Sequence, residues 1–282
     1  MDIVFILKAI LLGIVQGLTE FLPISSTGHL IIVQEFIDFP QNAFSTMFSV
    51  VIQLASILAV LILFWPRIWV KLKSFFKGER EGRNFMLIWV VGVIPAAVAG
   101  FLLNDFIDTY LFSVPTVAAA LIVGAIVLLL TEKHFAPKAV TKQVEEITWK
   151  QAVGVGMFQV LALWPGFSRS ASTIIGGWVM GMTTWLAADY SFFLAIPVMF
   201  GASGFSLFKY FRNASELGYA TAMTGNQVAA LIAGCIASFI VALLVVRAFM
   251  AFLRTHSMRG FAIYRLLVGA VLIALLIGGI MN

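Results

Sequence analysis

Hydrophobic residues follow one another in long runs along this chain, with short polar stretches between them and little alternation of polar and apolar positions. A bilayer crossing needs about 20 mainly apolar residues in a helix, and runs without period-two alternation favour helices over a β-barrel. The pattern therefore predicts an all-α polytopic membrane protein, built as a single integral membrane domain over residues 1–282. Its six membrane-spanning helices are expected at residues 44–65, 84–104, 115–132, 186–211, 226–248 and 260–281.

Two further hydrophobic stretches do not fit a simple crossing, because each is broken near its middle by proline. The first break contains Pro23, and the second contains Pro165 followed by glycine. A short apolar segment, a polar break and another short apolar segment are typical of a helix pair that enters the membrane and returns on the same side. The pattern predicts two such re-entrant hairpins, over about residues 3–37 and 150–181.

The two hairpins resemble each other in sequence. "AILLGIVQGL" (Ala9–Leu18) aligns with "AVGVGMFQVL" (Ala152–Leu161) at an offset of 143, and later segments of each half match at nearly the same offset. We therefore expect a duplication, with halves of about 1–143 and 144–282. Each half has one hairpin and three crossings, so the second half must insert upside down. In inverted repeats of this kind the broken helices meet near the midplane and form the site.

Charge is sparse, and its distribution predicts the orientation of the chain. The sequence is 61% hydrophobic and only 11% charged, which excludes an ordinary soluble domain. Its net charge of +5 is gathered in three connections, whereas "LNDFIDTY" (Leu103–Tyr110) has two aspartates and no basic residue. This is the positive-inside pattern of a membrane protein and not a nucleic-acid surface. It places the three basic connections in the cytoplasm and both termini outside.

Both breaks are rich in hydroxyl-bearing residues. Serine and threonine after a proline turn are natural helix N-caps, so any single hydroxyl has a structural explanation. Ionised groups at membrane depth are costly and usually functional, so Glu20 and Arg169 indicate a site, with a purely structural ion pair as the alternative. The candidate residues are Gln16, Glu20, Ser25, Ser26, Thr27 and His29 at the first break, and Ser168, Arg169, Ser170, Ser172 and Thr173 at the second.

These residue types are suited to binding phosphate. If both breaks begin new helices, two helix N-termini direct free N–H groups into one cavity. Arg169 adds a fork-shaped cation that matches phosphate oxygens. Glu20 conflicts with a bound anion unless a cation such as Mg²⁺ lies between them. Alternatively, Glu20 orients Arg169 or accepts a proton, and Gln16 lies on the same helix face one turn earlier.

The first break also has the residues of a nucleophile and its base. On a helix beginning after Pro23, Ser26 and His29 are three residues apart and Ser25 and His29 four, so either serine can share a face with the imidazole. A hydroxyl beside an imidazole is typical of covalent catalysis.

At this point the chain resembles a known family, the bacterial undecaprenyl-diphosphate phosphatases, also called bacitracin-resistance proteins. The resemblance rests on "QGLTEFLPISSTGHL" (Gln16–Leu30) and "LWPGFSRSAST" (Leu163–Thr173). It extends to "VVIQLASILAV" (Val50–Val60) and the late "FAIYR" (Phe261–Arg265). It implies a hydrolase that removes the terminal phosphate of a membrane-embedded polyprenyl diphosphate and needs Mg²⁺ or Ca²⁺. The product carrier is reused in cell-wall synthesis, and the family confers bacitracin resistance.

By the same resemblance, Glu20 is the essential acid and a metal ligand, Ser26 or His29 the attacking group, and Arg169 the phosphate-binding arginine. The hydroxyls of Ser25, Thr27, Ser168, Ser170 and Thr173 are expected to bind the diphosphate. Many family members have Glu at position 16, so Gln16 is assigned to lining the cavity around the diphosphate, with neutral coordination of the cation as a further option. The family also implies an active site on the outer face of the cell membrane.

Transport is the competing function, because broken helices at the midplane of an inverted repeat are also typical of transporters. The same pocket could then move a lipid phosphate across the bilayer. The oligomeric state stays open, with a homodimer as one option.

Overall fold

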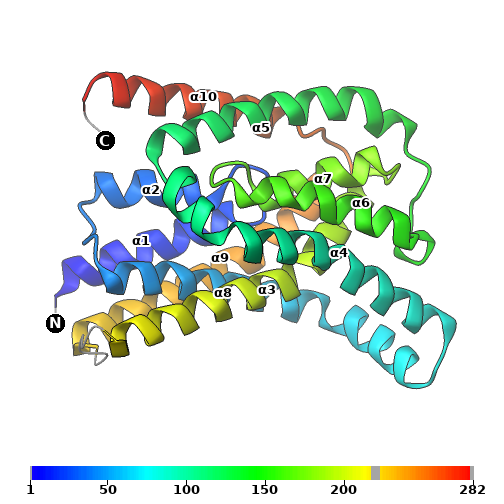
Figure 1. The fold of residues 1–282 in the computed structure, drawn as a ribbon, viewed down its shortest axis with the longest axis horizontal. Coiled ribbons are helices and arrows are strands. Elements are labelled where there is room, and N and C mark those ends of the chain that lie inside the picture. The colour runs from blue at the N-terminus through cyan, green and yellow to red at the C-terminus, as the bar shows by residue number, and fades with distance from the viewer. Residues whose placement is uncertain (1, 217–222, 280–282) are drawn as a thin grey trace.

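The computed structural model describes residues 2–216 and 223–279, and this part of the chain is helical and without strands (Figure 1). The all-α prediction is therefore confirmed. The helices are α1 (Ile3–Thr19), α2 (Ser26–Phe36), α3 (Ala43–Phe76), α4 (Arg80–Phe106), η1 (Ile107–Leu111), α5 (Val114–Phe135), η2 (Ala136–Lys138), η3 (Val144–Glu146), α6 (Trp149–Gln159), η4 (Val160–Leu163), α7 (Arg169–Val179), α8 (Thr184–Glu216), α9 (Gly225–Phe252) and α10 (Arg259–Ile277).

Six helices in the described ranges are long and apolar enough to cross a membrane, and they coincide with the six predicted crossings. They are α3, α4, α5, α8, α9 and α10. The predicted end of the last crossing, at residue 281, lies outside the described residues.

The main difference from prediction is the length of α3, which was expected to end at residue 65. The helix continues through Pro66 to Phe76, so its 34 residues extend over about 51 Å. A proline inside a membrane helix is tolerated where neighbouring groups satisfy the freed backbone. Consequently Arg67, Lys71 and Lys73 project from a helix, and the basic connection is only a short turn around Gly78.

The two short helix pairs approach the middle of the molecule from opposite ends. In Figure 1, α1 runs inward from one end and α2 returns to it, whereas α6 runs inward from the other end and α7 returns there. Their connections meet near the centre of the long axis. This places the N-termini of α2 and α7 at the centre of the fold, although insertion of the two halves in opposite senses across a bilayer stays a prediction.

Each inward helix packs on a long helix of the other half. A side chain at Gly13 of α1 would collide with the backbone of Gly234 in α9, and one at Gly156 of α6 would lie 2.5 Å from the carbonyl of Gly92 in α4. Glycine is required at these crossings because the two backbones touch. This reciprocal packing is the arrangement that a duplicated chain predicts.

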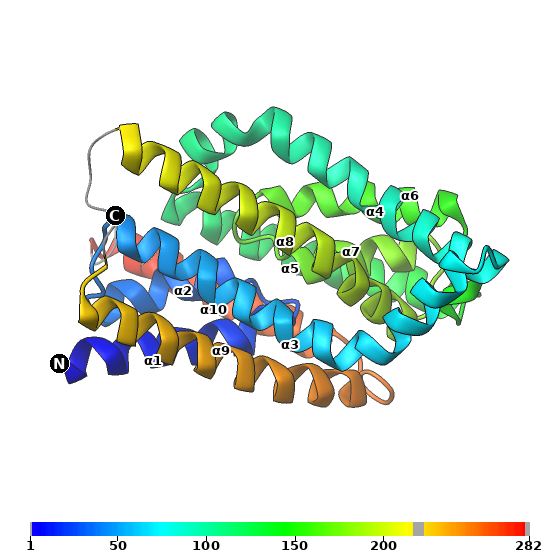
Figure 2. The same cartoon turned by 90° about the horizontal axis from the view of Figure 1, so that it is seen from below.

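The basic connections gather at one end of the molecule. The turn between α3 and α4, the start of α6 and the connection from α9 to α10 all lie at the right of Figure 2. The beginning of α1 lies at the opposite end. The three basic connections therefore share one end of the long axis, which is the distribution that the positive-inside rule predicts for cytoplasmic connections.

Aromatic side chains of α3 and α8 pack against the first break. Phe21 follows directly after Glu20, is fully buried and contacts Phe192 edge to face, with ring centroids 5.7 Å apart. Phe64 of α3 packs edge-on against Phe192 and Phe193 of α8, at 5.7 and 5.2 Å. These perpendicular ring contacts are favourable, and they join α3 and α8 to each other next to the first break.

Candidate active site

The first break begins where α1 ends. Glu20 caps the C-terminus of α1, and its backbone N–H donates to the carbonyl of Gln16. After Pro23 the chain turns at Ser25, whose φ of 72° is unusual for a residue other than glycine. The Ser25 hydroxyl accepts a hydrogen bond from Gly28 N–H and caps α2. The expected capping role of this serine is present.

The second break repeats this geometry 143 positions later. Gly166 has a φ of 101° and Ser168 a φ of 78°, and the Ser168 hydroxyl accepts from Ala171 N–H to cap α7. Backbone strain of this kind costs about 1–3 kcal/mol per residue and is concentrated at functional sites. Two strained serine caps therefore place two helix N-termini at the same central position.

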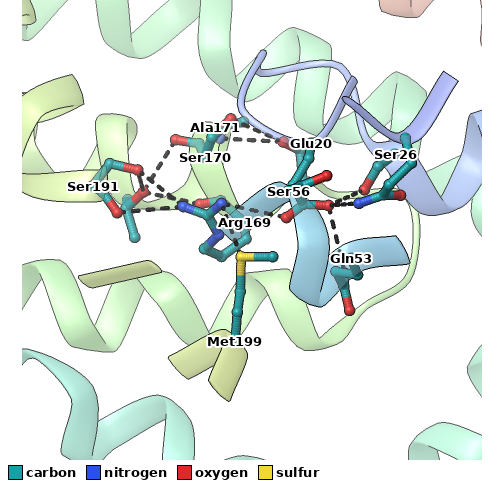
Figure 3. Close-up of polar contacts among 12 residues, drawn as sticks. Glu20, Ser26, Gln53, Ser56, Arg169, Ser170, Ala171, Ser191 and Met199 are labelled. Atoms are coloured by element: carbon teal, nitrogen blue, oxygen red, sulfur yellow. Dashed lines mark hydrogen bonds and ion pairs between the residues drawn. The ribbon is translucent and has the colours of Figure 1, made fainter. Parts of the chain in front are cut away.

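Glu20 is the centre of the polar contacts between these turns (Figure 3). Its Oε2 accepts hydrogen bonds from Ser26 Oγ at 2.6 Å, from Gln16 Nε2 at 2.9 Å and from Gln53 Nε2 at 3.4 Å. Only 7% of the residue is exposed. An ionised carboxylate with three donors is the arrangement that satisfies a buried charge.

Arg169 joins the second break to the first. Its Nη2 lies 3.3 Å from Glu20 Oε1, and its Nη1 donates to the carbonyl of Ser191 at 3.3 Å. Thr173 Oγ1 donates to Ser191 Oγ at 2.6 Å. Arg169 Nε has no hydrogen-bond partner among the described residues. Glu20 and Arg169 are in direct contact, so the structure shows the ion pair, and Arg169 keeps a free donor.

The predicted pairing of a serine hydroxyl with His29 is not made. His29 Nδ1 lies 2.7 Å from the carbonyl oxygen of Ser25, and Nε2 lies 2.7 Å from the hydroxyl of Tyr264. Ser26 instead donates to Glu20. The helical spacing was correct, but the imidazole points toward α10 and the hydroxyl points toward α1.

The remaining predicted residues line the turns. Ser168 Oγ and Ser170 Oγ lie 3.4 Å apart, and both residues are buried. Ser172 Oγ donates to the carbonyl of Ser168. Thr27 is half-buried in the first turn of α2. These hydroxyls lie at the helix starts, where donors for a bound anion are expected.

Sequence reasoning missed four residues that complete the arrangement. Gln53 and Ser191 contact Glu20 and Arg169 from α3 and α8, and their positions inside apolar helices gave little sign of this. Tyr264 and Arg265 belong to the late motif "FAIYR", which was noted only as part of the resemblance. A buried arginine in a predicted crossing is the signal that could have identified Arg265.

The residues present are compatible with one divalent cation. In the described part of the chain, no group of three His, Cys, Asp or Glu side chains could hold a metal alone. However, Gln16 Oε1 is buried and has no hydrogen-bond partner among the described residues, and Gln16 contacts Glu20. One carboxylate, one neutral oxygen and substrate phosphates form a donor set that suits Mg²⁺.

A separate polar cluster lies at the basic end of the molecule. Lys71 Nζ lies 2.6 Å from Glu145 Oε1 and 3.1 Å from Glu81 Oε2, beside a cavity of about 390 Å³ that Arg80 and Trp149 also line. Burial is the largest single influence on the Glu145 carboxyl and raises its pKa, but the hydrogen bond from Lys71, a backbone hydrogen bond and the charges of Lys71 and Arg67 together outweigh it, so the pKa lies below its ordinary value. This cluster ties α3, α4 and η3 together.

The fold and the central cluster define a class of protein: a polytopic helical membrane protein with a buried cluster of Glu20, Arg169 and hydroxyl groups between two helix N-termini. Residues 9–271 match the family described as bacitracin resistance protein BacA. The chain belongs to this family, which confirms the resemblance seen in the two motifs.

Relatives are similar over nearly their whole length. A protein named undecaprenyl-diphosphatase from Clostridium tetani is 47% identical over 96% of this chain and 97% of its own. Proteins of the same name from Caldanaerobacter subterraneus and Clostridium perfringens are 46% and 42% identical. Both alignments cover 98% of this chain, and they cover 98% and 97% of the length of the respective relatives.

Proposed function

We propose that this chain hydrolyses undecaprenyl diphosphate to undecaprenyl phosphate and inorganic phosphate. The observation that carries the proposal is the contact of Glu20 with both Ser26 and Arg169, between the starts of α2 and α7. The similar proteins are named as diphosphatases, which favours hydrolysis over transport. The reaction would return the lipid carrier to peptidoglycan synthesis, and so protect against bacitracin.

Arg169 and the two helix starts are proposed to bind the terminal phosphate. Arg169 has one unused donor, Nε, and its contact with Glu20 at 3.3 Å is longer than a tight charge-assisted hydrogen bond. The N–H groups at the starts of α2 and α7 supply further donors and the positive ends of two helix dipoles. Donors fixed before the substrate arrives stabilise the charge that develops on a transferring phosphoryl group.

Ser26 is proposed as the nucleophile and Glu20 as its base. The Ser26 proton passes to Glu20, the Ser26 Oγ–phosphorus bond forms, and the bond from phosphorus to the bridging oxygen breaks. Glu20 returns this proton to the departing lipid phosphate. Glu20 then takes a proton from water as the water oxygen bonds to phosphorus. The bond from phosphorus to Ser26 Oγ breaks, inorganic phosphate is released, and the proton passes from Glu20 to Ser26 Oγ.

The direct 2.6 Å contact between Ser26 and Glu20 favours Glu20 over His29 as this base. Both ring nitrogens of His29 contact other groups. His29 therefore acts in this scheme by holding the first turn.

A divalent cation, Mg²⁺ or Ca²⁺, is proposed as cofactor. Glu20 and Gln16 Oε1 would hold it together with substrate oxygens. When bound, it supplies positive charge to the diphosphate as the bridging oxygen leaves.

The site is proposed to open to the outer face of the cell membrane, with the basic end in the cytoplasm. The test is a single cysteine at the basic end, Phe75→Cys, in a chain whose native Cys235 is replaced by serine. Labelling by a membrane-impermeant maleimide should require permeabilised cells. Labelling in intact cells would reverse the orientation.

Phosphate release from undecaprenyl diphosphate by detergent-purified protein, with and without EDTA, tests the activity. We expect release that EDTA abolishes and Mg²⁺ restores. The Ser26→Ala variant should retain its helical circular dichroism but lose at least about 10³-fold in turnover. Absence of release by the wild-type chain would refute the proposed function, and wild-type turnover by Ser26→Ala would refute the site.

A further inference from the structure

Arg265 of α10 is a buried charge whose hydrogen bonds, among the described residues, all go to backbone carbonyls. The residue is fully buried, and no carboxylate in the described part of the chain lies within ion-pair distance of it. Its Nη1 donates to the carbonyl of Pro23 at 3.2 Å. Its Nη2 lies 2.8 Å from the carbonyl of Phe167, 3.2 Å from that of Gly166 and 3.3 Å from that of Ala120. A planar fork carries its donors on separate nitrogens and so spans three chain segments at once, whereas the donors of an ammonium group all lie on one nitrogen.

The two turns that Arg265 joins are the two breaks of the site. Pro23 and Gly166 lie 143 positions apart, and each is two residues before a strained serine cap. The fold makes room for the guanidinium, because any side chain at Gly124 of α5 would collide with it. One buried side chain thus contacts equivalent carbonyls of both turns.

Tyr264, the preceding residue, holds the first turn through His29. The Tyr264 hydroxyl and His29 Nε2 are 2.7 Å apart, and the two rings stack at 5.5 Å with an interplanar angle of 10°. The other nitrogen, Nδ1, faces the Ser25 carbonyl. A carbonyl only accepts, so Nδ1 carries the proton, and Nε2 of the neutral ring accepts from the tyrosine hydroxyl.

The second turn has a serine at the position that is equivalent to His29, and this serine shows which group is sufficient to contact the carbonyl of a serine cap. Ser172 occupies the position equivalent to His29, and its hydroxyl donates to the carbonyl of Ser168 at 2.8 Å. A hydroxyl is therefore sufficient to hold the carbonyl of a strained serine cap. The imidazole at position 29 makes the same contact and in addition reaches Tyr264, so the extra contact with α10 is what the histidine provides.

We infer that Tyr264 and Arg265 are positioning residues for the hydrolysis, because together they fix the two turns that carry Ser26 and Arg169. Arg265 contacts the carbonyls of both turns, and Tyr264 holds the carbonyl of Ser25 through His29. The inference rests on the proposed function, since it assumes that Ser26 and Arg169 act on the substrate. Neither positioning residue touches the phosphate in this scheme.

The decisive variant is Tyr264→Phe, which keeps the stacked ring and removes only the hydroxyl. A residue that positions reacting groups acts mainly on the transition state, so kcat should fall about tenfold while KM for undecaprenyl diphosphate changes less than about twofold. The control is Tyr110→Phe, a tyrosine that is 64% exposed and also packs against a second ring, that of Phe106. Its kinetic constants should equal those of wild type.

A double-mutant cycle separates positioning from general destabilisation. His29→Ser copies the arrangement at Ser172 and removes the group that Tyr264 contacts. In this background Tyr264→Phe should lower kcat by less than about twofold, because residues that act through one contact are not additive. An equal loss in both backgrounds would overturn the role of Tyr264.

Arg265→Lys is the second variant, measured for thermal unfolding in detergent as well as for activity. An ammonium group cannot reach all three segments, so kcat should fall more than in Tyr264→Phe. If this variant is unstable, Tyr264→Phe decides alone. Turnover by Tyr264→Phe within twofold of wild type, with Ser26→Ala inactive, overturns the inference and leaves the proposed function intact. Wild-type turnover by Ser26→Ala overturns the proposed site.

Discussion

The two breaks have similar backbone conformations and differ in their side chains. Ser25 and Ser168 adopt nearly the same left-handed conformation, and each accepts from the N–H three residues later. Gln16 and Gln159 also occupy equivalent positions and are both buried. The common features build two helix starts at the centre of the fold, an arrangement that is suited to binding an anion.

The chemistry lies where the equivalent positions differ. The first break has Glu20 where the second has Leu163, and Ser26 is equivalent to Arg169. One turn therefore supplies a carboxylate and a hydroxyl, and the other supplies the permanent cation. The comparison teaches that the proposed site needs both turns, because the proposed base and nucleophile come from one turn and the proposed phosphate-binding arginine comes from the other.

Removing the cation of the second turn should have the largest effect. Arg169→Ala leaves Glu20 without its ion pair and the phosphate without its clamp, so we expect turnover to fall at least about 10³-fold in phosphate-release assays. Arg259→Ala, at the exposed start of α10, is the matched control. Substantial activity in Arg169→Ala would mean that the two helix starts bind phosphate alone.

Removing the base of the first turn should have the next largest effect. Glu20→Gln keeps the size of the side chain but cannot accept the Ser26 proton, and we expect a loss of about 10²–10⁴-fold in kcat. The reciprocal substitution Leu163→Glu should not restore activity in Glu20→Gln, because the new carboxylate belongs to the second turn and not to the turn that carries Ser26. Rescue by that variant would show that the turns are interchangeable.

Substitution of the two caps tests what they share. Ser25→Ala and Ser168→Ala lose the capping hydroxyl and keep the strained backbone, and each should destabilise the protein by about 1 kcal/mol. Ser25→Gly and Ser168→Gly lose the same hydroxyl but relieve the strain, so their stability should remain close to that of wild type. Thermal unfolding in detergent gives the comparison. If glycine is as harmful to turnover as alanine, the hydroxyls also bind substrate.

The smallest effect is expected from Gln16→Glu, which adds a second carboxylate to the first turn. In the wild-type chain Gln16 Nε2 donates to Glu20. A glutamate at position 16 would repel the Glu20 carboxylate unless a cation lies between the two side chains. The variant should lower the concentration of Mg²⁺ that gives half-maximal activity by severalfold and lower the melting temperature in EDTA. An unchanged Mg²⁺ requirement would place the cation elsewhere.

Much of this arrangement could be predicted from the sequence, because hydrophobic run length is a direct consequence of bilayer thickness. The run lengths gave six crossings and two broken hairpins, and the motifs gave the residues of the two turns. Boundaries were less well predicted. Helix α3 continues through Pro66. This continuation was not predicted, because the sequence cannot show which neighbours satisfy the freed backbone.

Other contacts between side chains could not be predicted, because spacing along one helix does not say which way a side chain turns. His29 lies one helical turn after Ser25 and Ser26, yet its ring contacts Tyr264, 235 positions later. Gln53 and Ser191 come from apolar helices that pack around the turns.

The sequence by itself determined the membrane class, the helices and the two turns with their carboxylate, hydroxyls and arginine, since these depend on local composition and run length. Only the tertiary structure decided that Ser26 faces Glu20, that Arg169 meets the same carboxylate, and that Arg265 joins both turns. The contacts of Arg169 and Arg265 depend on long-range packing of helices, which brings together residues 98 to 242 positions apart. The contact of Ser26 with Glu20 depends on how the first turn folds back on α1.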